Sequence, residues 1–227
     1  TRRDEEYFAD EEHAWSLIWV EKAEDAWVRD VTSVHFGYSC VWARGSSKSV
    51  TVQDCACLDP VSRITGARRY SFAANGQQAL FLRCYARKGR HDFVMHARAP
   101  GPNAFVDCRA DNAYSDSGPH HRWATGTLYD NVVVNRNALN VRDRGPSGTG
   151  HGWAGAQQVF WNCRADRIIC QSPPTALNWA IGCIADSRSG DGWWASFGEP
   201  VTPQSLYIAQ LRERLGEAAV EAATGSR

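Results

Sequence analysis

The sequence contains no long apolar segment, since no run reaches the roughly 18 residues that a membrane-spanning helix requires. It also has no excess of charge of either sign, because Lys and Arg total 25 and Asp and Glu total 25. Nucleic acids and acidic membrane surfaces attract proteins with a basic surplus, so neither is indicated as a partner. We therefore predict a chain without a membrane span and without a nucleic-acid partner.

Several motifs of common enzyme classes are also missing. No serine is flanked as in G-x-S-x-G, and neither a phosphate-binding loop nor a dinucleotide fingerprint is present. Methionine occurs once, and the chain opens with TRRDEEYFADEE, without an initiator methionine or an apolar signal region. This opening predicts an excised or processed chain that continues at its N-terminal side, so it gives no indication of the compartment.

The residues that are present indicate a folded, tryptophan-rich protein. Hydrophobic residues make up 43% and charged residues 22%, which favours a packed core over disorder. Ten tryptophans either fill that core or stack on sugar rings. Among the eight cysteines, Cys55 and Cys57 are closely spaced, but no second pair lies at zinc-finger distance. A structural zinc site is therefore not predicted.

A recurring phrase places most of these cysteines. It consists of a short apolar stretch, a polar or small residue, and then Cys or Asn. The copies are DAWVRDV ending at Val31, SVTVQDC at Cys55, ALFLRC at Cys84, NAFVDC at Cys108, TLYDN at Asn131, QVFWNC at Cys163 and NWAIGC at Cys183. The spacings of 24, 29, 24, 23, 32 and 20 residues are too irregular for a propeller but suit the coils of a β-helix. We predict an all-β fold, a right-handed parallel β-helix or solenoid.

Stacked coils explain why the repeated residue is small. Equivalent side chains lie about 4.8 Å apart in such a stack, and a buried thiol fits an inward corner in every coil. Asn131 is predicted to join this cysteine ladder through stacked amides. Residues two positions earlier are predicted to form a second inward column: Leu82, Val106, Tyr129, Trp161 and Ile181. The cysteines are expected to be free thiols, because parallel side chains suit disulfide geometry poorly.

Helical signals are concentrated near the C-terminus. Thr202 is predicted as the N-cap of a helix over 203–223, with Pro203 at its first position. The predicted organisation is β-helix coils over residues 1–201, a packing or capping helix within 202–224 and a disordered tail at 225–227. A helix here would cover part of the solenoid, whose open edges otherwise invite aggregation.

The ladder also brings three separated histidines into one register. His96 and His151 each lie 12 residues before their ladder cysteine, and His121 lies 10 before Asn131. Stacked coils would place three imidazoles in a column flanked by Arg98, Trp123 and Trp153, with Gln171 at the same position in the next coil. The column has two further possible roles. The histidines could form an interior stack, or three imidazoles could bind a metal, although a straight column converges poorly on one ion.

These features resemble the pectin-lyase-like superfamily of right-handed β-helix proteins, of the secreted bacterial polysaccharide-degrading type. The resemblance covers roughly residues 15–200 and rests on the coil phrase and on HDFVMH, SGPHHRWATGTLYDN, GTGHGW and the closing PQSLYIAQLRERLG. It matches no specific enzyme family. It implies a secreted or periplasmic protein, a polysaccharide substrate and lyase or hydrolase chemistry. One fold hosts many functions, so the reaction must come from the site itself.

We expect a carbohydrate-active enzyme that cleaves an acidic polysaccharide by β-elimination. In that reaction a cation neutralises the substrate carboxylate and a base removes the neighbouring proton, roles that suit Arg and His. The predicted catalytic residues are His121, His151, His96 and Arg122. The predicted substrate-binding residues are Arg98, Trp123, Trp153, Arg90, Gln171 and Asp92. No motif predicts a metal or cofactor; Ca²⁺ is compatible with the sequence but has no motif to support it.

Two alternative functions remain. A glycoside hydrolase needs two carboxylates at a defined separation, and Asp92 and Asp116 are the candidates. Asp107 and Asp130 are weaker candidates, because Asp30 and Asp54 precede the ladder in the same way and indicate turn architecture. A non-catalytic module that binds glycans or serves a structural role is the second alternative.

Overall fold

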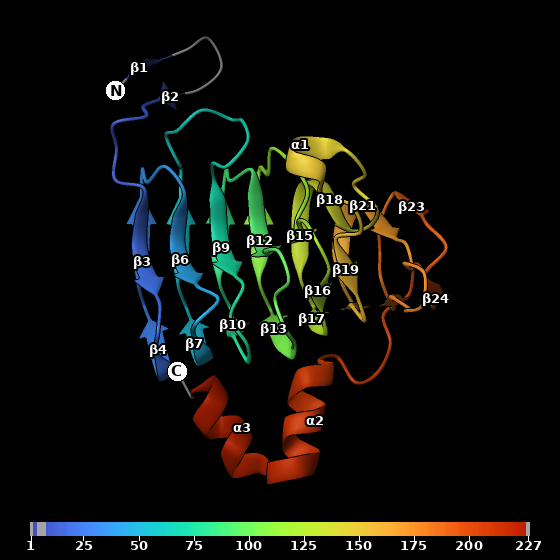
Figure 1. Ribbon diagram of the computed structural model, residues 1–227. Coiled ribbons are helices and arrows are strands. Elements are labelled where there is room, and N and C mark those ends of the chain that lie inside the picture. Colours follow the sequence, from blue (N-terminus) through green and yellow to red (C-terminus); the bar gives the residue numbers. More distant parts are fainter. Residues whose placement is uncertain (1, 4–7, 226–227) are drawn as a thin grey trace.

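The computed structural model describes residues 2–3 and 8–225, and most of its strands belong to three parallel β-sheets of eight, seven and five strands (Figure 1). A short antiparallel pair, β1 (Arg2–Arg3) and β2 (Phe8–Ala9), precedes them. The predicted all-β class with parallel strands is therefore confirmed. No helix in the described ranges is long and apolar enough to cross a membrane.

Each sheet is assembled from short strands. The five-stranded sheet contains β3 (Ser16–Val20), β6 (Ser39–Ala43), β9 (Tyr70–Ala74), β12 (His91–Met95) and β15 (Gly118–Pro119). The eight-stranded sheet contains β4 (Glu24–Arg29), β7 (Lys48–Gln53), β10 (Leu80–Leu82), β13 (Asn103–Val106), β17 (Thr127–Asp130), β20 (Val159–Trp161), β22 (Trp179–Ile181) and β24 (Trp193–Ala195). The seven-stranded sheet contains β5 (Thr32–Val34), β8 (Ala56–Leu58), β11 (Tyr85–Arg87), β14 (Arg109–Asp111), β18 (Val133–Val141), β21 (Arg164–Cys170) and β23 (Ser187–Ser189). A small parallel pair joins β16 (Ala124–Thr125) and β19 (Gly155–Ala156), and α1 (Ser147–Gly150) lies between β18 and β19.

The chain visits the three sheets in rotation through most of its length. After β6 in the five-stranded sheet come β7 in the eight-stranded and β8 in the seven-stranded sheet, and β9 then pairs with β6. We call one such passage a rung. Each new rung adds one strand beside its predecessor in each sheet, at about 4.8 Å, so residues about two dozen positions apart become neighbours.

The corner between the eight-stranded and seven-stranded sheets holds two repeated positions. The first is occupied by residues with positive φ: Asp30, Asp54, Arg83, Asp107, Asn131, Asn162 and Gly182. The second is occupied by Val31, Cys55, Cys84, Cys108, Val132, Cys163 and Cys183, and the following residue's N–H bonds to the equivalent carbonyl one rung earlier, as in Val133 to Cys108 and Arg164 to Val132. The prediction that Asn131 stacks with the cysteines is therefore wrong. Asn131 holds the left-handed turn position, which Asn tolerates well.

The same corner corrects the predicted second inward column. The rings in contact inside are Phe81, Phe105, Tyr129 and Phe160, each three residues before the second corner position, so Tyr129 lies inside as predicted. Leu82 and Val106 form a separate apolar cluster packed against Tyr207. The physical reason is the left-handed residue at the turn, which interrupts the two-residue alternation of the strand. Counting back two residues from a corner cysteine, across this left-handed residue, therefore reaches the outer face.

The position also explains the preference for cysteine. All eight cysteines are free and buried, and five occupy this corner. The thiol of Cys108 donates to the Phe81 carbonyl one rung earlier at 3.4 Å, and Cys163 donates to the Tyr129 carbonyl at 3.2 Å. A small apolar side chain with a weak donor thus fills the corner and bonds to the preceding rung.

Two helices cover the outer face of the eight-stranded sheet. They are α2 (Leu206–Leu215) and α3 (Glu217–Thr224), separated by Gly216 at φ 83°. The cap is Ser205, whose hydroxyl accepts from the Ile208 N–H at 3.1 Å, and not the predicted Thr202. Asp130 fixes this end, because its carboxylate accepts from the Ser205 hydroxyl and the Tyr207 N–H.

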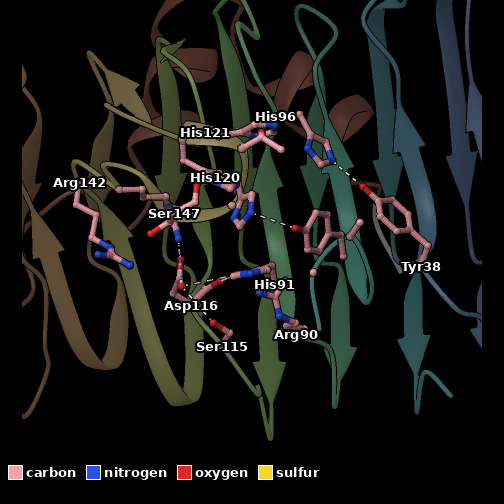
Figure 2. A pocket seen from close by; sticks show the side chains of 17 residues that line it. Tyr38, Arg90, His91, His96, Ser115, Asp116, His120, His121, Arg142 and Ser147 are labelled. Atoms are coloured by element: carbon pink, nitrogen blue, oxygen red, sulfur yellow. Dashed lines mark hydrogen bonds and ion pairs between the residues drawn. The ribbon is translucent and has the colours of Figure 1, made fainter. Parts of the chain in front are cut away.

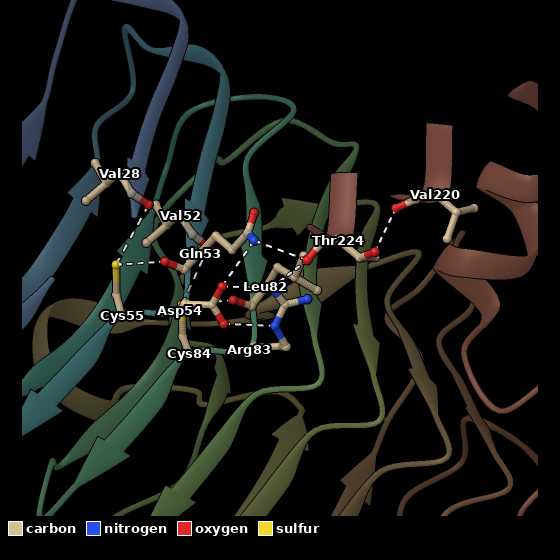
Figure 3. A network of polar contacts seen from close by, with 10 residues as sticks. All are labelled: Val28, Val52, Gln53, Asp54, Cys55, Leu82, Arg83, Cys84, Val220 and Thr224. Carbon is tan, nitrogen blue, oxygen red and sulfur yellow. Dashed lines mark hydrogen bonds and ion pairs between the residues drawn. The ribbon is translucent and has the colours of Figure 1, made fainter. Parts of the chain in front are cut away.

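The far end of the helical segment is also anchored (Figure 3). The Thr224 carbonyl accepts hydrogen bonds from Arg83 and Gln53, and Arg83 is held in turn by Asp54 in a bidentate ion pair. Both ends of the helical pair are therefore bonded to corners of the sheets. The predicted disordered tail covers residues 225–227, and its part beyond Gly225 lies outside the described residues.

Candidate functional site

A pocket of about 600 Å³ opens beside the five-stranded sheet. Its lining contains five histidines, two tyrosines, three arginines and one carboxylate: His91, His96, His120, His121, His151, Tyr38, Tyr70, Arg90, Arg142, Arg144 and Asp116. These residues come from strand ends and adjoining connections on successive rungs, so the stacking of rungs is what brings together residues from 38 to 151.

Strand register positions the floor of the pocket. Tyr70 begins β9 and pairs with His91 at the start of β12, and Met95 pairs with Pro119 of β15. This register carries His96 and His120, each directly after its strand residue, into neighbouring positions. Loops form the walls: Gly66 and Ala67 belong to the connection before β9, and Ser147 to Thr149 belong to the connection that holds α1.

Gly148 allows the second wall to close around a histidine. It has φ 57°, and a Cβ at this position would overlap the imidazole of His151. Only glycine combines that backbone conformation with so close an approach. The glycine-rich segment between residues 145 and 152 therefore positions His151 at the pocket.

The aromatic and imidazole rings form one continuous cluster (Figure 2). The Tyr38 hydroxyl shares a hydrogen bond with His96 Nε2 at 2.9 Å, and the Tyr70 hydroxyl shares one with His120 Nε2 at 3.1 Å. The His120 ring centroid lies 4.4 Å from that of His91 and 4.9 Å from that of His151. Contacts this dense fix the orientation of each ring.

Burial keeps most of these imidazoles neutral at neutral pH. It lowers the pKa of His91 to about 4 and that of His96 to about 3, in both cases because the charged form loses its hydration. Burial, with the nearby His151, also lowers the pKa of His121 to about 4. The pKa of His120 falls further below its ordinary value, through burial and then through His91 and Arg144.

Two histidines have a defined tautomer. The Nδ1–H of His91 donates to the Asp116 carbonyl at 2.5 Å, and the Nδ1–H of His151 donates to the Ser147 carbonyl. A neutral imidazole that donates from Nδ1 carries its lone pair on Nε2. His151 is half-buried at the pocket, so its Nε2 can accept a proton from a bound molecule.

Asp116 is the one carboxylate in the lining of this pocket as the structure describes it, and it is engaged by arginine. The Arg144 guanidinium forms a buried ion pair with it. Burial opposes ionisation of Asp116, but His91 in its protonated form and Arg144 outweigh it and hold the pKa of Asp116 well below its usual range. Arg90 and Arg142 add two further guanidinium groups, so cationic groups outnumber anionic ones.

Several buried polar atoms of the pocket have no hydrogen-bond partner among the described residues. They include Arg90 Nη1, His91 Nε2, His120 Nδ1, His121 Nδ1 and Arg142 Nε. Because leaving a buried donor or acceptor unpaired costs about 1–3 kcal/mol, these atoms are available to pair with a bound molecule. The arrangement suits a polar, anionic ligand. A resident metal fits less well, because no group of three His, Cys, Asp or Glu residues in the described part of the chain has a geometry that could hold an ion.

The structure brings together four of the ten predicted site residues. His96, His121, His151 and Arg90 line the pocket, and the ring centroids of His121 and His151 lie 5.0 Å apart. Figure 2 shows His96, His120 and His121 between Tyr38 on one side and Arg142 on the other.

The other six lie outside this lining. Arg98 is exposed, and the Arg122 side chain bonds to Thr149 in the loop that forms one wall of the pocket. Trp123 is 39% exposed, and Trp153 lines a separate shallow depression with Pro173 and Leu177. Gln171 accepts from the Asp143 N–H through its side chain.

Asp92 lies inside the fold. It is fully buried and accepts a hydrogen bond from Ser71 at 2.6 Å, and burial raises its pKa to about 7. It is therefore not among the residues that could contact a molecule in the pocket.

Sequence reasoning missed His91, His120, Tyr38, Tyr70 and Arg144. With Val132 in place of Asn131 as the corner residue, His120 lies 12 positions before it, the same offset that His96 has from Cys108. The corrected register would thus have found His120. His91 and Tyr70 pair with each other only through the strand register, which has no separate signal in the sequence.

Comparisons of the chain with protein-family models, with curated proteins and with solved structures find no match.

Proposed function

We propose that this protein is a polysaccharide lyase that cleaves an acidic polysaccharide by β-elimination, built on a right-handed parallel β-helix of the pectin-lyase-like superfamily. The observation that carries the proposal is the pocket itself, where three arginines and five histidines converge around a single carboxylate that is already paired. A uronate brings the carboxylate that such a surplus of guanidinium groups would bind.

The rotation of the chain through three parallel sheets supports the β-helix assignment, since a β-helix is the simplest path that adds one strand to each sheet per rung. The proposed secreted or periplasmic location follows from the substrate, because such polymers lie outside the cell. Polysaccharide is the proposed partner, and further coils on the N-terminal side would continue the three sheets.

Each step of the reaction has a candidate residue. Arg142 and Arg90, which have unpaired buried nitrogens, would bind and neutralise the uronate carboxylate. His151 Nε2, or His121 beside it, would take the proton from the carbon next to that carboxylate. The C–H electron pair then forms a carbon–carbon double bond as the glycosidic C–O bond breaks.

The leaving oxygen needs a proton, and Tyr70 is the candidate donor. Burial raises the pKa of Tyr70, so its hydroxyl keeps its proton at neutral pH and can act as an acid. Its hydrogen bond to His120 orients the hydroxyl. The base gives up its proton to solvent and the tyrosine regains one, which closes the cycle.

Hydrolysis fits the pocket less well. Two carboxyl groups must flank the scissile bond, one of them protonated. Asp116 is ionised and bound to Arg144, and Asp92 is buried in the interior. The described lining therefore offers no second carboxyl group for the acid role.

The test is incubation of the protein with a panel of uronic-acid polysaccharides. The expected result is an unsaturated product with ultraviolet absorbance. Release of reducing ends without this absorbance would instead indicate a hydrolase, and binding without either product would indicate a non-catalytic glycan-binding module.

A further inference from the structure

A row of aromatic residues leads away from Tyr38 at one side of the pocket. From the stacked pair Tyr38 and His96, ring contacts lead outward to Trp42, whose centroid lies 5.2 Å from that of Tyr38 and 5.1 Å from that of His96. Trp19 follows at 6.0 Å from Trp42. The row crosses β9, β6 and β3, which are adjacent in Figure 1.

The strand register places the tryptophans of this row at paired positions on the outer face of the five-stranded sheet. Trp19 pairs with Trp42, and Trp42 pairs with Ala73, so large rings occupy the first two rungs and a small residue the third. Trp19 is 50% exposed and Trp42 is half-buried. An exposed tryptophan beside a polar pocket is the feature expected where the apolar face of a sugar ring is bound.

Arginine accompanies the tryptophans. The Arg44 guanidinium lies 4.9 Å from the ring centroids of both Trp19 and Trp42, and Arg68 lies 5.7 Å from that of Trp15. Arg44 also meets Glu21 at 3.3 Å, but this pair is solvent-exposed and contributes little. The two cation–π contacts position the guanidinium, which can exchange Glu21 for a carboxylate of a ligand.

From these contacts we infer that Trp19, Trp42 and Arg44 form a polymer-binding track that takes further sugar units of an acidic polysaccharide whose reacting unit occupies the histidine pocket. The inference rests on the proposed function for the identity of the ligand. It adds that the substrate is a long chain and that it extends across the rungs toward β3. Aromatic rings bind the sugar faces, and Arg44 binds a carboxylate.

The experiment compares the affinity of the full chain for a uronate disaccharide and for a long oligouronide by fluorescence titration. The unaltered protein should bind the long oligomer more tightly. Trp19→Ala and Trp42→Ala should each weaken its binding by about five- to tenfold, the effect of one lost ring stack, and leave the disaccharide affinity unchanged. Trp42→Phe, which keeps a ring, should retain most of the affinity.

Trp27→Ala is the matched control, because Trp27 is 69% exposed but belongs to β4 in another sheet. It should change neither affinity. Arg44→Gln should weaken binding of the acidic oligomer and reduce its dependence on salt, with no effect on a neutral oligosaccharide. Loss of affinity for both chain lengths in the tryptophan variants, or for neither, would overturn the track.

The two proposals fail in different ways. Chain-length-dependent binding without unsaturated product would reject the lyase and keep the track. Unsaturated product with equal affinity for both lengths would keep the lyase and reject the track. Absence of binding to every oligouronide would reject both.

Discussion

His151 and His121 face the pocket from the ends of two neighbouring rungs, and both remain partly accessible. If one of them removes the proton, replacing it with Ala should lower kcat by about 10²- to 10⁴-fold, the usual contribution of a general base. The fold should persist, because neither imidazole is fully buried. Turnover measured by ultraviolet absorbance, with circular dichroism on the same samples, provides the check. His35→Asn is the control, since His35 is exposed and does not line the pocket. Undiminished turnover in both His121→Ala and His151→Ala would remove these two histidines from the mechanism.

Asp92 should make stability depend on pH in the opposite sense to a paired surface carboxylate. Its pKa rises through burial to about 7, although Ser71 donates to it, so the folded state favours the protonated acid. This preference stabilises the fold fully below the ordinary pKa of about 4 and is lost as the pH rises through about 7. Asp92→Asn removes the titrating group and should raise the free energy of unfolding at about pH 8 by up to roughly 4 kcal/mol relative to the unaltered protein. Urea denaturation at about pH 5 and about pH 8 measures the difference, and an equal effect at both would contradict the assignment.

At the corner between the eight-stranded and seven-stranded sheets, one residue must adopt a left-handed backbone conformation and the next must fill a buried space. Asn131 has φ 55°, whereas Val132, the next residue, is buried among corner cysteines. Asn131→Val should destabilise the fold by about 1–3 kcal/mol, because a β-branched residue is strained at positive φ. Val132→Cys should change stability by less than about 1.5 kcal/mol, because cysteine fills this corner in neighbouring rungs. Thermal denaturation of the two variants compares the positions directly, and the reverse order of stabilities would show that the corner has been misassigned.

The sequence predicted where the strands lie better than which of their residues face the interior. The repeated phrase located strands of the eight-stranded sheet and the corner that follows them, because apolar alternation and a small turn residue are local signals. It misplaced Asn131 and Leu82 by one position, because a left-handed residue at the corner changes the count and has no fixed identity: Asp, Arg, Asn and Gly all occupy it. Likewise, the Ser205 hydroxyl that caps α2 is also held by Asp130, 75 residues earlier, and such a contact is not visible in the sequence.

For the molecule as a whole, the histidine cluster sets the response to acid. His91, His96, His120 and His121 have pKa values lowered chiefly by burial, so they stay neutral when folded but take up protons when unfolded below about pH 6.5. Their contribution is complete above that pH and is lost as the pH falls toward 4, on the order of 3 kcal/mol for a fully buried histidine such as His91. Urea midpoints should therefore be lower at about pH 4.5 than at about pH 7. His91→Gln should flatten this dependence, whereas His35→Asn should leave it as it is; an unchanged slope in the first variant would contradict the assignment.

The pocket also has two parts, a floor and walls, that tolerate insertions and deletions in the sequence to different degrees. Its floor consists of paired strand ends, where one inserted residue would shift every side chain beyond it to the opposite face. Its walls consist of the connections before β9 and around α1, which leave the sheets and return to them. Insertions or deletions in those connections can reshape the opening without altering the strand register. Related chains are thus expected to share the histidine and tyrosine positions of the floor while differing in loop length, so that one pocket floor could accommodate ligands of different shape.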